Sequence, residues 1–192
     1  MNTYVAPESW TSPEFSIRSY HAGDGPLLRE ATNSSFDHLK ATMPWALRDQ
    51  TEEEALSLVR RFRARYLMAE DFVMGIFSPA GDELLGGTGF HLREGGLESG
   101  NAEVGMWIRA ERAGQGLGTR VLRAMLAWGF DEWPWQRIAW KASADNVPSQ
   151  RVAEKAGMQP EGVLRSHLIV PDGSRRDTAL YAALRSEWQA ES

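Results

Sequence analysis

Three glycines alternate with larger residues in the segment Ala113-Gly114-Gln115-Gly116-Leu117-Gly118-Thr119. A strand pattern precedes this segment and a helix pattern follows it, so successive backbone N–H groups and the positive end of the helix dipole would converge on an anion. Side chains at these positions would block a pyrophosphate, and glycine also adopts backbone angles closed to other residues. The segment, here called the glycine turn, predicts phosphate binding, with a merely flexible turn as the alternative.

Two common phosphate motifs do not fit the glycine turn. The nucleotide P-loop ends in Lys-Ser/Thr, whereas Gly118 is followed by Thr119-Arg120. The dinucleotide fingerprint spaces its glycines as G-x-G-x-x-G, whereas the spacing here is G-x-G-x-G. The P-loop and the dinucleotide fingerprint are therefore set aside as interpretations of the glycine turn.

One carboxylate lies on the strand that leads into the glycine turn. In the run Ala102 to Ile108, alternation places Glu103, Gly105 and Trp107 on one face of the strand and the apolar residues between them on the other. A carboxylate so placed can act as a general base. A solvated carboxylate on a strand face is the alternative.

Helices and strands must position these groups, and the hydrophobic periodicity predicts them along most of the chain. Thr51 and Glu54 have the spacing of a capping box. Asp145-Asn146 with Pro148 marks a helix start, and Gly157 marks the end of that helix. The predicted helices are 24–39, 51–66, 118–131 and 147–156, and the predicted strands are 15–20, 72–77, 84–92, 102–108, 137–142, 163–170 and 175–184, the last two joined by the turn Pro171-Asp172-Gly173-Ser174.

The composition narrows the class of protein. The chain has 192 residues, no cysteine and a formal net charge of -5, which excludes disulfides, thiolate metal sites and a cysteine nucleophile. Lys and Arg are scattered, so a nucleic-acid partner has little support, and the histidines lack the spacing of a metal site. No apolar run approaches the roughly 18 residues that cross a bilayer. We expect a cytoplasmic protein with no membrane partner.

Four segments jointly resemble the GNAT superfamily of acyl-CoA-dependent N-acyltransferases, from about residue 15 to residue 188. They are AEVGMWI before the turn, AGQGLGT in it, SADNVPSQRVAEKAGM after the next strand, and EGVLR with DTALYAALRSEW in the last hairpin. The family's pyrophosphate turn reads Gln/Arg-x-x-Gly-x-Gly/Ala; Gly116 and Gly118 match its glycines, and Ala113 stands at its Gln/Arg position. The chain looks closest to the branch that acetylates ribosomal-protein N-termini.

The resemblance implies acetyl-CoA or another form of coenzyme A as co-substrate, and no metal. The pyrophosphate of coenzyme A would bind the glycine turn, Ala113 to Thr119. The pantetheine arm would pair with main-chain groups of Trp107, Ile108 and Arg109. Asn146 and Ser149, at the start of the following helix, would contact the cofactor as well, although Asn146 also has the position of a helix cap.

The resemblance also implies catalytic roles. Glu103 would be the general base, because the family often places a carboxylate on this strand. Many members carry a tyrosine that protonates the departing thiolate, but Ala153 stands at that position. Ser149 would orient or relay a proton near the thiol, since a serine hydroxyl donates a hydrogen bond without readily losing its proton.

The acceptor amine would bind near a variable connection in such proteins. Here that connection contains Trp45, with Phe36 and His38 before it, and core packing is an equal alternative for these residues. His91, on a predicted strand, would point into the same cleft or be structural.

The resemblance implies an N-terminal arm of residues 1–14 and a single domain with an α/β fold over residues 15–192. Its sheet would be mixed, mostly antiparallel, of about seven strands and splayed in the middle, with about four helices flanking it. The reaction would be direct transfer of an acetyl or other short acyl group from coenzyme A to the primary amine of a protein N-terminus or a small molecule, in a ternary complex. A non-catalytic acyl-CoA sensor or interaction module and a nucleotide-phosphate binder are the alternatives, and a homodimeric state stays open.

Overall fold

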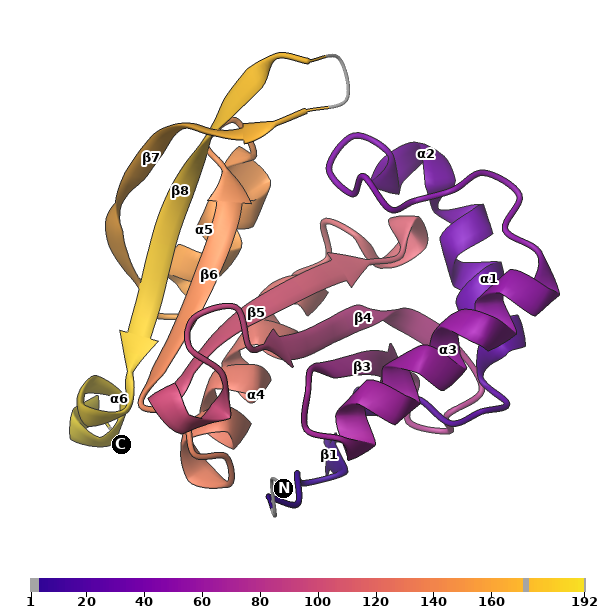
Figure 1. The fold of residues 1–192 in the computed structure, drawn as a ribbon, viewed down its shortest axis with the longest axis horizontal. Coiled ribbons are helices and arrows are strands. Elements are labelled where there is room, and N and C mark those ends of the chain that lie inside the picture. Colours follow the sequence, from indigo (N-terminus) through magenta and orange to yellow (C-terminus); the bar gives the residue numbers. More distant parts are fainter. Residues whose placement is uncertain (1–3, 171–172, 192) are drawn as a thin grey trace. The chain divides into compact units, whose positions relative to one another are not determined.

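The structure, a computed structural model, describes residues 4–170 and 173–191. Over these residues it contains six α-helices and eight β-strands (Figure 1). Within the sheet, neighbouring strands follow the order β1-β2-β3-β4-β5-β6-β8-β7. Strands β5 and β6 run parallel, whereas the pairs β1–β2, β2–β3, β3–β4, β6–β8 and β7–β8 are antiparallel. The chain divides into two compact units. The first unit comprises Met1–Leu92 and Gly105–Gln115, and the second unit comprises Arg93–Val104 and Gly116–Ser192.

The first unit packs helices on antiparallel strands. Its helices α1 and α3 contact each other and cover strands β2 to β4 (Figure 1). A buried cluster that includes Tyr20, Leu28 and Val59 lies between these layers. The elements are β1 (Ser9–Thr11), β2 (Ser16–Ser19), α1 (Gly25–Ser34), α2 (Phe36–Leu39), α3 (Glu52–Leu67), β3 (Phe72–Phe77), β4 (Leu84–His91) and a short 3-10 helix, η2 (Ala110–Arg112).

Strand β5 (Asn101–Ile108) contributes to both units. In the second unit, its residues Asn101–Glu103 pair in parallel with Arg137–Ala139 of β6. In the first unit, the carbonyl oxygen of Gly105 accepts a hydrogen bond of 3.0 Å from the hydroxyl of Thr88 on β4. The strand that leads into the glycine turn therefore has a hydrogen-bonding partner in each unit.

The second unit has β6 between β5 and β8, with β7 outermost. Helix α4 contributes a buried stripe that includes Val121, Leu122 and Met125, and it contacts α5. Trp128, Trp133, Trp135 and Trp140 are all buried, so they form part of the core. The elements are η1 (Leu97–Ser99), α4 (Leu117–Asp131), β6 (Arg137–Ser143), α5 (Val147–Lys155), β7 (Gln159–Ile169), β8 (Arg175–Leu184) and α6 (Arg185–Glu191).

The structure differs from the predicted elements in three places. Ser9–Thr11, inside the predicted arm, form β1 by pairing with β2, so the described residues hold eight strands rather than seven. The predicted helix 24–39 is interrupted at Ser35, whose φ of -103° and ψ of 6° lie outside the helical range. The C-terminal Arg185–Glu191 segment adds a helix. The predicted hairpin is confirmed by the β7–β8 pairing, while Pro171 and Asp172 of its turn lie outside the described residues.

Candidate functional site

In the second unit, Gly116 caps the N-terminus of α4 in the left-handed conformation, with a φ of 78°. This conformation is strained for other residues and open to glycine. The N–H groups of Leu117, Gly118 and Thr119, in the first turn of the helix, have no acceptor within the helix. They lie at the positive end of the dipole of a 15-residue helix. These are the physical requirements for binding a phosphate.

The first unit contributes Ala113, Gly114 and Gln115 of the glycine turn. Gly114 also has a positive φ, 74°, and a β-carbon there would meet no atom within 4 Å. Gln115 is exposed and donates a hydrogen bond of 2.7 Å to the carbonyl of Glu111. The space next to Gly114, where a side chain would begin, is therefore open.

Sequence reasoning missed a cation beside the turn. A β-carbon at Gly116 would lie 3.1 Å from Nη1 of Arg120, which places the guanidinium next to the helix cap. Arg120 follows Gly116 by four residues on α4, a spacing at which helical residues face each other. That spacing was the signal that could have identified it.

The predicted pantetheine residues end β5. Both main-chain groups of Arg109 are engaged within the protein: its N–H donates to Leu85 and its carbonyl accepts from Arg112. Its buried guanidinium forms ion pairs with three carboxylates, Glu30, Glu83 and Glu111. The Arg109 side chain is thus held by the fold, and the pairing of the main chain of Trp107, Ile108 and Arg109 with pantetheine stays a prediction.

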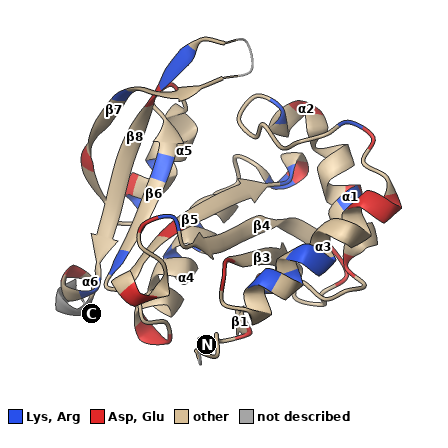
Figure 2. Cartoon of the chain, viewed as in Figure 1, with Lys and Arg blue, Asp and Glu red and all other residues tan. Residues whose placement is uncertain are grey.

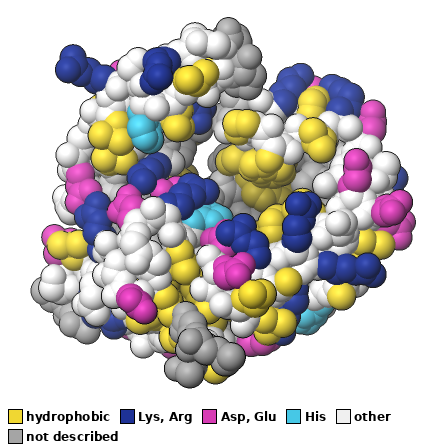
Figure 3. Space-filling model, viewed as in Figure 1, with side chains coloured by type: hydrophobic (Ala, Val, Ile, Leu, Met, Phe, Trp, Pro, Cys, Tyr) yellow, Lys and Arg dark blue, Asp and Glu magenta, His cyan; other side chains and the backbone are white. Residues whose placement is uncertain are grey.

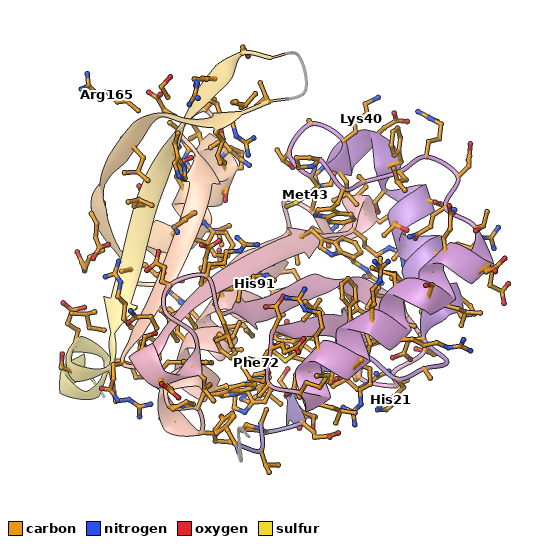
Figure 4. The ribbon with its side chains drawn as sticks, viewed as in Figure 1. His21, Lys40, Met43, Phe72, His91 and Arg165 are labelled. Carbon is orange, nitrogen blue, oxygen red and sulfur yellow. The ribbon has the colours of Figure 1, made fainter. Side chains whose placement is uncertain are left out.

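The structure brings two of the predicted binding tryptophans together. The rings of Trp45 and Trp107 meet edge to face, with centroids 5.8 Å apart. Trp107 also lies against β4, because a β-carbon at Gly87 would be 2.3 Å from its indole nitrogen. Trp45 is 47% exposed. In Figure 3, hydrophobic side chains gather over the connection after α2, where Figure 4 places Met43.

The other predicted acceptor residues on α2 are differently placed. The guanidinium of Arg48 lies 4.4 Å from the centroid of the Phe36 ring, and Lys40 lies over the same ring. Both cations pair with Asp37. His38 is exposed. The ring of Phe36 is therefore in contact with the charged side chains of Lys40 and Arg48. The roles of Phe36 and His38 in acceptor binding stay predictions.

His91, at the end of β4, pairs with a carboxylate that the sequence did not identify. Its Nδ1 lies 2.9 Å from Oδ1 of Asp71. The β3–β4 register, in which Phe72 is opposite Phe90, continues to place Asp71 opposite His91. Asp71 is buried, and Arg65 of α3 lies 3.4 Å from its other oxygen. Figure 4 shows His91 among the labelled side chains of the first unit.

In the second unit, Glu103 is buried between two cations. Its Oε1 accepts a short hydrogen bond from Arg93, and its Oε2 lies 3.0 Å from Nζ of Lys141 without the alignment of a hydrogen bond. Burial lowers the pKa of Lys141, but the carboxylates of Glu94 and Glu103 outweigh this effect and raise it above its ordinary value. Lys141 is therefore charged, and Glu103 faces two positive charges. Its role as a base stays a prediction.

The start of α5 also lies in the second unit. The side-chain oxygen of Asn146 accepts a hydrogen bond of 3.1 Å from the N–H of Ser149, which confirms the predicted helix cap. The hydroxyl oxygen of Ser149 lies 3.2 Å from Nε1 of Trp140. Since an indole N–H only donates, Ser149 accepts there and its own proton can be donated elsewhere. Ala153 is fully buried.

Two features of other protein classes are absent from the described residues. Among them, no group of three or more His, Asp and Glu side chains has the arrangement of a metal site. No described helix is long and apolar enough to cross a membrane. Figure 2 shows acidic and basic residues interspersed on the helices and strands of each unit.

Comparisons with known proteins give a consistent family. A family model described as an acetyltransferase (GNAT) domain matches residues 15–159. The uncharacterized N-acetyltransferase YoaA of Bacillus subtilis (strain 168) is 29% identical over 157 residues, which are 81% of this chain and 87% of YoaA. An acetyltransferase of the GNAT family from Bacillus anthracis is 25% identical, with a TM-score of 0.75 over 92% of this chain and 98% of its own.

A further solved structure shares the fold. RimL, a ribosomal L7/L12 α-N-protein acetyltransferase determined in complex with coenzyme A, has a TM-score of 0.80 at 21% identity and covers 90% of this chain and 95% of its own.

Proposed function

The chain belongs to the GNAT acetyltransferase family, and on that premise we propose that it transfers an acetyl group from acetyl-CoA to a primary amine. The observation that carries the proposal furthest is the left-handed Gly116 at the N-terminus of α4. Family membership gives the class of reaction, and this helix start gives the chain a place for the donor's phosphates.

The residues of the glycine turn fit a pyrophosphate. The N–H groups of Gly116 to Thr119 are the donors, and a positive helix dipole supports them. Arg120 adds a formal positive charge beside Gly116. Gly114, with no atom within 4 Å of the β-carbon position, leaves space for the rest of the ligand. Asn146 and Ser149, at the start of α5, are proposed as further contacts of the donor.

Acetyl-CoA supplies an activated acetyl group as a thioester. In the proposed step the amine nitrogen forms a bond to the carbonyl carbon, the carbon–sulfur bond breaks, the amine loses a proton to a base and the sulfur gains one. The hydroxyl of Ser149 donates a hydrogen bond toward the sulfur as it becomes negative. The chain has no cysteine, and the proposed transfer is direct, within a ternary complex.

The proposed acceptor is a protein N-terminal α-amine or a small-molecule amine. An α-amine, with a pKa of about 7.7 to 8.0, is partly neutral near pH 7, whereas a lysine side chain at about 10.4 is not. Exposed apolar side chains of the first unit, Trp45 and Leu47, offer a surface for an apolar residue next to that amine. The ribosomal-protein substrate of RimL is one such acceptor, so the N-terminus of a ribosomal protein is included in the proposal.

Gly116→Val tests the donor site. A branched side chain disfavours a φ of 78° and occupies the space of the phosphate. We expect calorimetry to show at least about a tenfold loss of coenzyme A affinity, equal to about 1.4 kcal/mol. The matched control is Gly81→Val, because Gly81 has a φ of 77° and nothing within 4 Å of its β-carbon position, in the turn between β3 and β4.

The two variants separate strain from binding. Equal thermal stability of both, with coenzyme A affinity lost only in Gly116→Val, supports the assignment. Unchanged affinity in a folded Gly116→Val protein would remove the glycine turn as the donor site. Acetylation itself is measured as thiol release from acetyl-CoA with a panel of peptide and small amines, and mass spectrometry identifies the product.

A non-catalytic acyl-CoA sensor is the second candidate. Ala153 favours it, since this buried methyl group cannot supply the proton that a tyrosine gives to the thiolate in many family members. A sensor would bind acetyl-CoA by calorimetry and release no thiol above the background rate with any amine in the panel. That combination would overturn acetyl transfer while keeping the donor site.

A further inference from the structure

The protonation pattern of the Asp71–His91 pair follows from its geometry. An ionised carboxylate only accepts hydrogen bonds, so the 2.9 Å contact with Oδ1 of Asp71 requires the proton of the imidazole to be on Nδ1. A neutral imidazole then carries a lone pair on Nε2. The ring of His91 can therefore accept a proton at Nε2. The buried carboxylate of Asp71 fixes the tautomer and the orientation of the ring.

The free ring nitrogen points toward strand β5. Nε2 of His91 lies 2.8 Å from the position that a β-carbon at Gly105 would occupy, so any other residue at 105 would collide with the ring. The missing side chain at Gly105 makes room for this nitrogen. The side chain of His91 is 17% exposed, so the ring is not wholly enclosed by the protein.

The same face of β5 carries the tryptophan pair. Gly105 and Trp107 are two residues apart, so both face the same side of the strand, about 6.6 to 6.8 Å apart along it. His91 covers Gly105, and Trp45 contacts Trp107. Within the first unit, a basic nitrogen and an exposed aromatic surface are thus neighbours.

The contacts of Glu103 suit a different task. Arg93 and Lys141 both lie against its carboxylate, and proton uptake would leave these two cations without that negative charge. His91 has the opposite arrangement, since its only described ion pair is with a carboxylate, that of the buried Asp71.

We propose that His91, positioned by Asp71, is the base that takes the proton from the acceptor amine. This rests on the acetyl transfer proposed above. As the amine nitrogen forms its bond to the carbonyl carbon, the N–H bond of the amine breaks and its proton binds Nε2. The ring becomes positive beside the carboxylate of Asp71. It returns to the neutral form by releasing the proton to water.

The charged groups described around His91 in the first unit are Asp71, which precedes β3, and Arg65, which lies on α3 against the far oxygen of Asp71. Asp71 is in direct contact with the ring, so Asp71→Asn should alter the pH profile of turnover more than the loss of Arg65 does.

His91→Asn is the direct test, because an asparagine amide can still donate a hydrogen bond to Asp71 while lacking a basic nitrogen. We expect kcat at neutral pH to fall by roughly 10²- to 10⁴-fold, the range for loss of a general base. Coenzyme A affinity should stay within about twofold, a change of under 1 kcal/mol. The deficit should shrink above about pH 8, where an α-amine arrives neutral.

Three further variants isolate the role. Addition of imidazole should restore turnover to His91→Ala, which a purely structural histidine would not allow. Asp71→Asn should lower kcat and shift the pH profile, because its side chain no longer carries a negative charge. His21→Asn, at an exposed histidine outside the site, should keep the profile of the parent protein.

The outcomes separate this role from the reaction itself. A His91→Asn protein with kcat within threefold of the parent at every pH would overturn the role of His91. A large, pH-recoverable loss in Glu103→Gln alone would assign the base to Glu103 instead. A parent protein that binds acetyl-CoA and acetylates no amine would overturn the reaction, and the base with it.

Discussion

The contacts of Ser149 leave its hydroxyl proton available for a hydrogen bond to a further group. Its oxygen accepts from the indole of Trp140 and its N–H donates to Asn146, so its proton can be donated to a further group. A hydrogen bond to a charged group contributes about 1.5 to 3 kcal/mol. Ser149→Ala should therefore lower kcat by roughly 10- to 100-fold, with little change in acetyl-CoA affinity.

Steady-state kinetics with saturating amine measures this effect, and Ser149→Thr is its control because threonine keeps the hydroxyl. Threonine should retain most of the turnover that alanine loses. An unchanged kcat with a raised KM for acetyl-CoA in Ser149→Ala would make Ser149 a binding residue without a role in the chemical step.

Some site residues could be predicted from the sequence and others could not. The glycine turn and the Asn146 cap follow from local rules, since each depends on its own chain neighbours. Asp71 could not be predicted, because it is 20 residues from His91 and meets it through the β3–β4 register. The two cations beside Glu103 likewise come from the loop after β4 and from β6.

At the scale of elements, helix α3 begins with a complete capping box. The Thr51 hydroxyl accepts from the N–H of Glu54, and the Glu54 carboxylate accepts from the N–H of Thr51. Loss of such a cap costs about 1 kcal/mol. Thr51→Ala should lower the free energy of unfolding by that amount, measured by urea denaturation.

Ser57→Ala is the matched control for this helix, because Ser57 is an exposed serine in its interior. Alanine is favoured over serine there, so the control should be neutral or slightly stabilising. An equal loss of stability in both variants would mean that the cap contributes nothing specific to α3.

Sequence patterns predicted most elements and failed where tertiary pairing decides. The periodicity of residues 51–66 and the strands 72–77 and 84–92 agree closely with α3, β3 and β4. The strand β1 has only three residues, too few for a periodic signal, and is defined by the pairing of Ser9–Thr11 with β2. Ser35 breaks an otherwise periodic helix; its hydroxyl accepts from the N–H of Ala110, far along the chain.

At the scale of the whole molecule, paired carboxylates predict acid sensitivity. Asp24 accepts hydrogen bonds from both terminal nitrogens of Arg18 and from the N–H of His21. Burial alone would raise the pKa of Asp24, but these bonds outweigh burial and hold it below its usual value. A depressed folded-state pKa stabilises the protein above the unfolded value, near 3.9, and that stability is lost as the pH falls through the folded value.

Asp24→Asn should therefore lower the free energy of unfolding by a constant amount between about pH 7 and 5, and by progressively less below about pH 4. Urea unfolding at several pH values measures this difference. Asp131→Asn, at an exposed aspartate, corrects for the removal of one carboxylate from the surface. A difference between Asp24→Asn and its parent that is the same at pH 7 and pH 3 would contradict the assignment.

The division of β5 between the two units has a consequence for synthesis on the ribosome. The first unit ends at Gln115, whereas Asn101–Glu103 pair with β6, whose other partner, β8, ends at Leu184. At a synthesis rate of about 5 to 20 residues per second, the chain of the second unit is completed several seconds after that of the first. During that time a nascent chain carries the start of β5 as an unpaired strand edge, a site that chaperones or a neighbouring nascent chain can bind.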